Sequence, residues 1–180
     1  MKSLNSYITE GGFFKNVKAE LVTPENKKEL IKIINDTIEK EGPNCNLNFI
    51  DTSKITDMSA LFYSSKFNGD ISNWDVSGVK NMMSMFAYSK FDGDISKWNV
   101  SKVKNMGSMF YHSSFTGDIS KWNVSEVRDM HSMFSYSYFN GDISKWNVSN
   151  VKDMRNMFDG SKLEKLNKIP SWYKSIRMHK

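Results

Sequence analysis

The chain has 180 residues, of which 39% are hydrophobic and 25% are charged, and its formal net charge is +5. This composition is typical of one folded domain and excludes a globally disordered chain. No stretch reaches the roughly 20 apolar residues that a membrane helix needs, and the first residues lack the apolar block of a signal peptide. We therefore expect no membrane insertion, and the sequence leaves the compartment open.

A helix is predicted at about residues 24–41, within an N-terminal cap that covers residues 1–45. Thr23-Pro24-Glu25 supplies a capping side chain, a proline at the first helical position and an acid in the first turn. Apolar residues then recur at helical spacing: Leu30, Ile33, Ile34 and Ile38. We expect this apolar face to cover the open end of the first repeat.

The only cysteine is Cys45, so the chain forms no internal disulfide and no cysteine zinc cluster. No neighbouring histidine or basic run in the sequence would activate its thiol. We expect Cys45 to be buried and unreactive.

A 24-residue unit recurs four times without a gap over residues 67–162. Each copy carries the motif G-D-I-S-x-W-[DN]-V-S-x-V-x-[DN]-M-x-x-M-F. A degenerate unit precedes these copies, and a broken one begins at Leu163, where Ile169 and Trp172 are displaced by two residues. Terminal units of a repeat array are commonly atypical because one face of each has no neighbour. The sequence predicts about five repeats over residues 46–162.

Each unit is predicted to contain a short strand followed by a short helical turn. An alternation puts Ser72, Trp74 and Val76 on one side, which is typical of a strand. Apolar residues within 79–86 then lie three or four apart, which is typical of a helix, and Ser77 is its candidate N-cap.

Stacking of the units is required for stability. Fixing a backbone costs about 1–2 kcal/mol per residue, while some eight apolar side chains return about 1.5–3 kcal/mol each, so one unit alone barely balances. The recurring glycine, first seen at Gly69, fits a position with positive φ or a close approach of the next coil. With strands paired in parallel, the predicted fold class is an α/β repeat solenoid that is leucine-rich-repeat-like and capped by the N-terminal helix.

Stacking also places equivalent residues of successive units in columns. The tryptophan column is predicted to fill the core rather than to form a strip for sugars: Trp74, Trp98, Trp122 and Trp146. One aspartate column could hold Ca²⁺ between coils, but we expect each carboxylate to accept backbone N–H bonds in its own turn: Asp70, Asp94, Asp118 and Asp142. Similar backbone bonding is expected of the serine column that includes Ser89 and the column that includes Asp75.

The repeat motif resembles that of BspA-like leucine-rich-repeat surface proteins, a type that is also abundant among mycoplasma lipoproteins. The resemblance covers about residues 46–162, and GPNCNLNFIDTSKITDMSALF resembles what precedes the repeats in such proteins. It implies a place at a bacterial surface and a role in adhesion or protein binding. Similar repeats also occur in proteins linked to phages, so a virion is the other location that the resemblance implies.

Catalytic residues, metal sites and cofactors are not expected. Repeats supply identical groups, whereas catalysis needs converging groups with different roles. The three histidines share no column and no HExxH spacing: His112, His131 and His179. The sequence therefore predicts that the chain is not an enzyme.

Outward positions that differ between units are candidates for a binding surface, because positions that face a neighbouring coil are fixed by the stack. Tyr, Arg and Met are among the types enriched at protein interfaces. The candidate partner-binding residues are Met83, Tyr88, Lys97, His112, Lys121, His131, Tyr136, Tyr138 and Arg155. They predict a non-enzymatic module for protein–protein interaction or adhesion. The alternative is a self-associating structural component of a larger assembly, such as a phage particle or cell envelope.

Residues 163–180 are predicted to form a basic C-terminal cap or a docking tail. Basic residues outnumber the single acid there, whereas the rest of the chain is nearly neutral: Lys165, Lys168, Lys174, Arg177 and Lys180 against Glu164. A nucleic-acid-binding face would need basic residues gathered on a folded surface. No nucleic-acid partner is therefore expected.

Overall fold

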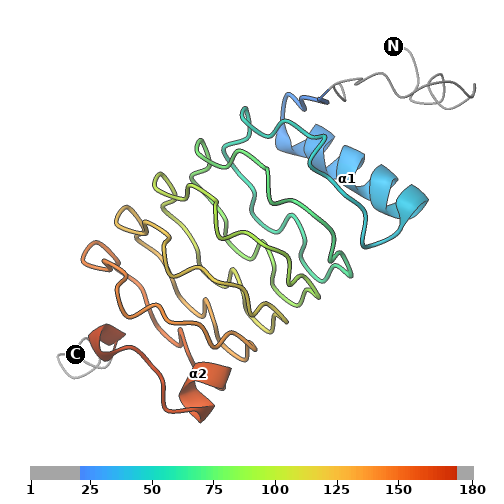
Figure 1. Cartoon of the computed structure of the whole chain (residues 1–180). Coiled ribbons are helices and arrows are strands. Elements are labelled where there is room, and N and C mark those ends of the chain that lie inside the picture. Colours follow the sequence, from blue (N-terminus) through green and yellow to red (C-terminus); the bar gives the residue numbers. More distant parts are fainter. Residues whose placement is uncertain (1–20, 174–180) are drawn as a thin grey trace, which may run out of the picture.

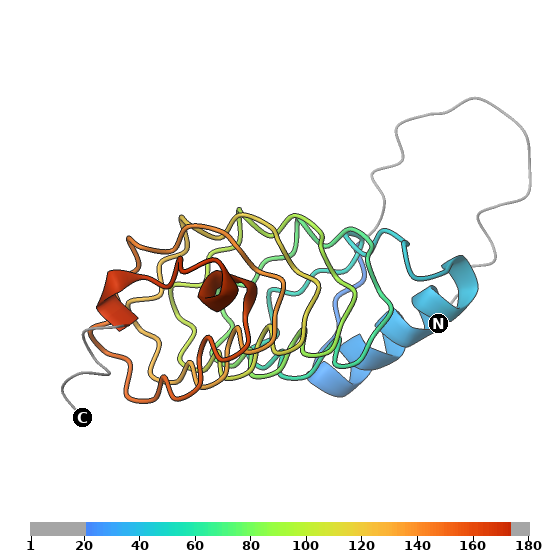
Figure 2. The ribbon, with the colours of Figure 1, turned by 90° about the horizontal axis from the view of Figure 1, so that it is seen from below.

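The computed structural model describes residues 21–173, so the basic residues beyond Tyr173 lie outside the described part of the chain. Its labelled helices are α1 (Lys27–Glu41) and α2 (Lys162–Lys165), and residues 171–173 are also helical. Between them the chain makes successive passes that lie side by side, with α1 at one end of the array and α2 at the other (Figure 1). Figure 2 shows the same passes as loops around a common interior. Neither helix is long and apolar enough to cross a membrane.

The N-terminus of α1 lies three residues beyond the predicted start at residue 24. Its N-cap is Asn26, whose side-chain oxygen accepts a hydrogen bond from the backbone N–H of Glu29 at 3.1 Å. Thr23, the predicted cap, instead donates from its hydroxyl to the Asp51 carboxylate at 3.2 Å. Both residue types can cap a helix, and the contact with the first unit takes Thr23 out of that role.

One face of α1 packs on the first unit. Leu30 and Ile34 are buried in the core. The helix ends at Glu41 before Gly42, whose φ of 88° favours glycine. Cys45 follows and is 7% exposed, and burial raises the pKa of its thiol. The expectation of a buried thiol is confirmed, and the raised pKa keeps it in the unreactive protonated form.

Each unit turns at three Asp or Asn side chains that accept the backbone N–H two residues further on. In the unit that begins at Phe91 these are Asp94, Asn99 and Asn105, with oxygen–nitrogen distances of 2.9, 3.2 and 2.8 Å. In the degenerate first unit they are Asn46, Asp51 and Asp57, at 2.8, 3.0 and 2.7 Å. Such bonds favour turns over helix or strand. The backbone path is therefore shared even where the apolar residues differ.

These turns replace the strand predicted within each unit. Residues 71–76 lie between two of the turns, and pairing across the described part of the chain is limited to isolated parallel bridges such as Asn81 with Asn105. The alternation of buried and exposed residues at Trp74 and Val76 arises from the turns on either side. This alternation has the same two-residue period as a strand, which is why the sequence predicted one.

The predicted helical turn is also interrupted. Ser84 has a φ of 56°, and the next such residue in the unit is Tyr88 with a φ of 57°. Short i to i+3 bonds form around them, for example from the N–H of Met85 to the carbonyl of Met82 at 3.2 Å. A left-handed residue every fourth position prevents helix propagation, so Ser77 caps no helix.

Successive units are joined by backbone hydrogen bonds at a fixed offset along the second half of each unit. The N–H of Met82 donates to the carbonyl of Asn105 at 2.9 Å, and that of Met106 donates to Asp129 at 2.9 Å. Three more backbone bonds per unit join a donor to the carbonyl 23 residues later. The units therefore stack in one register. Assignment to the leucine-rich-repeat-like solenoid class stays a prediction.

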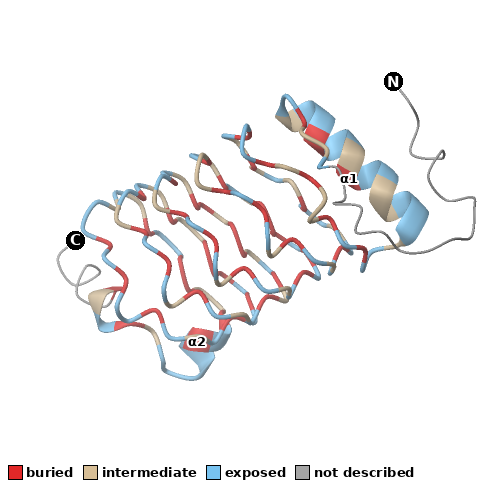
Figure 3. Ribbon diagram, turned by 45° about the horizontal axis from the view of Figure 1, so that its top comes forward, coloured by how far each residue is buried: buried red, intermediate tan, exposed pale blue. Residues whose placement is uncertain are grey.

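The interior consists of columns of apolar residues, and buried and exposed segments alternate along each pass (Figure 3). Phenylalanine rings stack between units: the centroids of Phe86 and Phe110 lie 5.8 Å apart, and within the core Phe86 and Phe91 lie 4.4 Å apart. The four repeat tryptophans are 4–5% exposed. The prediction that they fill the core is confirmed.

Each tryptophan also ties its unit to the one before. The indole N–H of Trp122 donates to the carbonyl of Ile95 at 3.1 Å, and the same bond recurs for the other repeat tryptophans. That carbonyl also accepts the backbone N–H of Trp98 at 3.2 Å. The first half of each unit thus has a side-chain link to its neighbour, where backbone ladder bonds are sparse.

The recurring glycine serves a close approach rather than a positive φ. A Cβ at Gly117 would lie 2.8 Å from the ring of Phe115, two residues earlier in the same unit. At Gly69 it would also lie 1.9 Å from the carbonyl oxygen of Cys45 in the preceding unit. Neither glycine has a positive φ. The glycine therefore leaves room for the buried phenylalanine to fold back over the turn.

The C-terminal residues continue the stack for one more partial unit. Leu163 in α2 is buried, and Ser161 caps that helix by accepting the N–H of Glu164 at 3.1 Å. The indole of Trp172 donates to the carbonyl of Ile143 at 3.2 Å, which is the bond made by the repeat tryptophans. The displaced tryptophan therefore occupies the equivalent place, and these contacts favour a cap over a free tail for residues 163–173.

Replacement of Trp122 by Phe or Ala should separate its two contributions. Trp122→Phe removes the indole donor but leaves Ile95 with one partner, so we expect a loss of about 1 kcal/mol. Trp122→Ala also opens a cavity in the core and should cost about 3–5 kcal/mol. Urea unfolding followed by circular dichroism measures both. Equal losses for the two variants would contradict the assigned hydrogen bond and packing roles.

Candidate binding surface

Three of the predicted surface residues form the centre of an exposed aromatic strip. Tyr88, His112 and Tyr136 occupy equivalent positions in successive units, and their rings stack in parallel. Ring centroids lie 5.0 Å apart for Tyr88 and His112, and 4.7 Å apart for His112 and Tyr136. Tyr88 is 45% exposed and Tyr136 is 52% exposed. The stack fixes the rings while their edges face solvent.

Two tyrosines that the sequence analysis missed extend this strip. Tyr63 meets Tyr88 edge-on at 5.7 Å, and Tyr111 meets His112 edge-on at 4.6 Å. Both occupy the position just before the stacked column, where the other units carry small or acidic residues. The presence of tyrosine there in two of the five units was the available signal. We define the aromatic strip as Tyr63, Tyr88, Tyr111, His112 and Tyr136.

The stacked rings sit on strained backbone. The φ values of Tyr88, His112 and Tyr136 are 57°, 50° and 54°, a left-handed region that costs about 1–2 kcal/mol for an L residue with a side chain. The last unit carries Gly160 at this position, with a φ of 65°. A Cβ on Gly160 would lie 2.6 Å from the ring of Tyr136. The glycine therefore leaves room for that ring at the end of the strip. The backbone itself would favour glycine in every unit.

A second set of predicted residues lies in another column, where internal contacts dominate. Met83 is 39% exposed. His131 folds back over the preceding unit, because a Cβ at Gly107 would lie 2.5 Å from its ring. Its Nδ1 lies 2.7 Å from the Asp129 carboxylate, and its Nε2 lies 3.4 Å from the Ser108 hydroxyl. This column does not form a continuous surface strip.

Arg155 completes that column in the last full unit. Its guanidinium donates to both carboxylate oxygens of Asp153, at 2.7–3.2 Å, and its backbone N–H donates to the same group at 3.0 Å. These bonds lower the pKa of Asp153 to about 2. A surface hollow of about 310 Å³ lies beside it, lined by His131, Ser132, Arg155 and Asn156.

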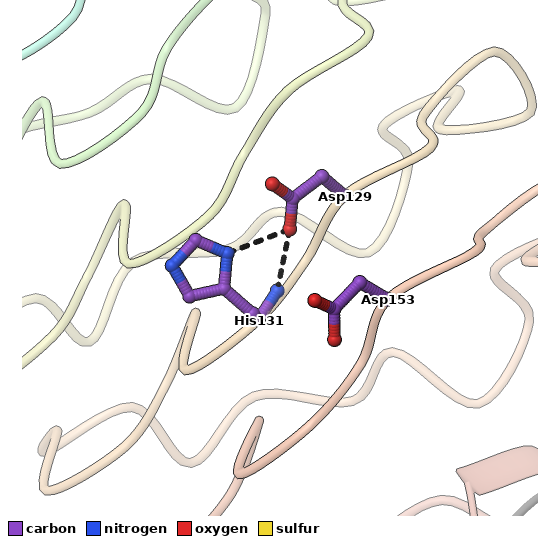
Figure 4. A group of neighbouring side chains, drawn as sticks. All are labelled: Asp129, His131 and Asp153. Atoms are coloured by element: carbon purple, nitrogen blue, oxygen red, sulfur yellow. Dashed lines mark hydrogen bonds and ion pairs between the residues drawn. The ribbon is translucent and has the colours of Figure 1, made fainter.

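One group in this region has side chains of metal-ligating type. Oxygen and nitrogen atoms of Asp129, His131 and Asp153 lie within 4.8 Å of one another (Figure 4). In the figure the Asp129 oxygen accepts from both the ring and the backbone of His131. Asp153 is ion-paired with Arg155. The positive guanidinium and the internal hydrogen bonds already satisfy both carboxylates, which opposes binding of a cation.

The remaining predicted residues lie apart from the strip. Lys97 and Lys121 are exposed and lie near the carboxylates of Asp94 and Asp118, whose pKa values are lowered first by hydrogen bonds to Ser96 and Ser120 and also by these lysines. The expected backbone bonding of this aspartate column is confirmed in all four full units.

Tyr138 is 65% exposed and has no ring contact with an aromatic residue within 21–173.

Comparison with known sequences places the chain in a family. Residues 32–138 and 112–176 match the family described as Mycoplasma protein of unknown function, DUF285. The chain belongs to this family. No curated protein and no solved structure gives a match.

Replacing Arg155 should change the titration of Asp153. A folded pKa of about 2 lies below the unfolded value of about 3.9, so the ion pair stabilises the fold above about pH 4, and this is lost as the pH falls toward 2. In Arg155→Gln the backbone N–H remains, and we expect the pKa of Asp153 to rise part of the way toward 3.9. Because Arg155 is exposed, the loss of stability should be small at pH 7, and it should vanish near pH 2.

Carboxyl-carbon NMR titration measures the pKa, and urea unfolding at several pH values measures the stability. Lys152→Gln is the matched control, since Lys152 neighbours Asp153 in sequence and has no ion pair with it. Identical Asp153 titrations in wild type and Arg155→Gln would contradict the assignment.

Proposed function

We propose that the chain is a non-enzymatic protein-binding module whose partner docks on the aromatic strip. The observation that carries this proposal is the presence of aromatic side chains at three successive left-handed positions, where glycine would relieve strain. The left-handed backbone itself belongs to the repeat, since Ser84, Ser108 and Ser132 share it at a second position of the units. What distinguishes the column of Tyr88, His112 and Tyr136 is that large exposed rings occupy it.

The geometry of the strip suits a protein partner. Tyrosine supplies a large contact area with few rotatable bonds, and aromatic residues are enriched among those that dominate binding energy. Tyr88 and Tyr136 are held on either side of His112 by stacking, so little side-chain freedom remains to be lost on association. The strip offers a rigid contact surface at little entropic cost.

We also propose that the chain has no enzymatic role. Support comes from how the acidic groups of the units are used, because Asp and Asn side chains at the three turns accept backbone N–H bonds. The histidines described by the structure are used in ring stacking and in a hydrogen bond with Asp129. These groups serve the fold, and catalysis needs groups free to change their bonding.

We further propose that the repeats form a BspA-like, leucine-rich-repeat-like solenoid that acts in adhesion at a cell surface. Support comes from the 24-residue period of the parallel bridges and from the capping contacts at both ends. The family match to proteins of unknown function agrees with a surface repeat protein but leaves adhesion as a proposal. In this view residues 1–45 cap one end, and residues 163–180 include the cap at the other.

Glycine substitutions test whether the strip binds a partner while leaving the protein folded. Tyr88→Gly, His112→Gly and Tyr136→Gly combined remove the stacked rings and also relieve three left-handed residues. Lost ring contacts and relieved strain are each about 1 kcal/mol per position, so stability should change little. Binding of the partner should weaken at least about tenfold, because anchor residues commonly contribute 2 kcal/mol or more.

The measurement is affinity capture from native extract of the source organism with mass spectrometry, followed by calorimetry on the captured protein. Tyr138→Ala is the control, since it removes an even more exposed tyrosine outside the strip. Equal capture by wild type and by the folded triple variant contradicts the proposal. Sedimentation that shows only self-association of the wild type, unchanged in the variant, supports the structural-component alternative.

A further inference from the structure

A column of basic residues runs along the stack outside the aromatic strip. Lys80, Lys104, Arg128 and Lys152 occupy equivalent positions in four successive units, and all four are exposed. Direct backbone bonds join them, from the N–H of Lys104 to the carbonyl of Lys80 at 2.8 Å, and onward at 2.9 and 2.8 Å. We call these residues the basic column. The backbones that carry these side chains follow one another at about 4.8 Å, the usual spacing of hydrogen-bonded backbones.

The basic column has no acidic partner in the described part of the chain. No ion pair involves any of its four residues. The nearest carboxylates in sequence are used elsewhere: Asp129 bonds His131, and Asp153 bonds Arg155. One acid, Glu126, lies two residues before Arg128, and Lys102 holds the equivalent place in the preceding unit.

A second lysine column provides a contrast within the same units. Lys97 and Lys121 lie near Asp94 and Asp118, so their charges are partly neutralised by the fold. In the basic column the like charges repel one another, and no carboxylate of the described residues neutralises them. An external anion with several negative charges in line would neutralise them.

We propose that the basic column binds a linear acidic polysaccharide that carries one acidic group on each sugar residue. The column is one residue wide and follows the direction in which the units stack, and a sugar residue in an extended polysaccharide is about as long as the step between units. Each acidic group can therefore meet one Lys or Arg side chain, and long flexible cations adapt to carboxylate or sulfate alike.

Nucleic acid fits this surface less well. A duplex strand winds around its axis and leaves a straight column after a short distance. Single strands need exposed aromatic faces for base stacking, whereas the rings of Tyr88, His112 and Tyr136 stack on one another. The proposal concerns a different column from the protein-binding strip and does not depend on it.

Charge substitutions in matched pairs test the proposal on the full chain. Lys104→Gln with Arg128→Gln removes two charges from the basic column, and Lys97→Gln with Lys121→Gln removes two charges from the compensated column of the same two units. Fluorescence anisotropy measures binding of labelled oligogalacturonate, a carboxylated polysaccharide fragment, and of heparin oligosaccharide, a sulfated one. Dextran is the neutral control, and oligothymidylate is the nucleic-acid control.

We expect wild type to bind at least one acidic oligosaccharide, with affinity that falls as salt rises. The basic-column variant should bind at least about tenfold more weakly, and the control variant should bind within about twofold of wild type. The basic C-terminal residues are unchanged in both, so a loss confined to the first variant assigns the site. The glycine-substituted aromatic-strip variant should bind these probes as wild type does.

Three results overturn the proposal. Absence of binding by wild type at low salt does so, and so does equal weakening in the two charge variants, which would reflect the general field of the protein. Tighter binding of oligothymidylate than of either oligosaccharide, with the same dependence on Lys104 and Arg128, would assign the column to nucleic acid instead. Circular dichroism of both variants verifies that these exposed substitutions leave the fold intact.

Discussion

The structure depends on one local interaction, in which an Asp or Asn side chain accepts the backbone N–H two residues further on. It occurs at three places in every full unit and also in the first unit, whose apolar residues have diverged. Because the same turns recur, each unit follows the same path and can pair with its neighbour. The hydrogen bonds between units, the columns of Phe and Trp, and the surface columns all follow from that shared path. A single unit would lack the burial needed to offset its conformational entropy.

The stack turns small differences between units into surface features. Positions that face a neighbour are occupied by identical or similar residues, while each outward position forms a column of its own. At one such position aromatic residues remain although the backbone is left-handed, and the final glycine marks how the column ends. At another, basic residues recur without acidic partners. The first column carries the proposed protein-binding surface, and the second carries the proposed polysaccharide site.

The acidic side chains show why few of them are available for chemistry. The carboxylate of Asp94 accepts the N–H of Ser96, and Asp153 is held by both the backbone and the guanidinium of Arg155. Both interactions stabilise the charged form and lower the pKa of the carboxyl group. A group near Asp129 and His131 has the composition of a metal site, but its members already satisfy one another. The repeats thus use their polar residues mainly to shape the backbone.

The sequence by itself determined the 24-residue period, the burial of the tryptophans and the start of the N-terminal helix to within three residues. These depend on residue type and spacing, which a 24-residue recurrence makes explicit. It gave the wrong local conformation within the units, because turns between buried residues mimic the spacings of strand and helix. Tyr63 and Tyr111 were missed because only the stack brings their position beside Tyr88 and His112. The basic column was missed because its residues vary little between units, whereas a binding surface was expected only where the units differ. Only the tertiary structure decided that these four residues are exposed and that no ion pair of residues 21–173 includes them, because exposure and pairing depend on side chains from other parts of the unit.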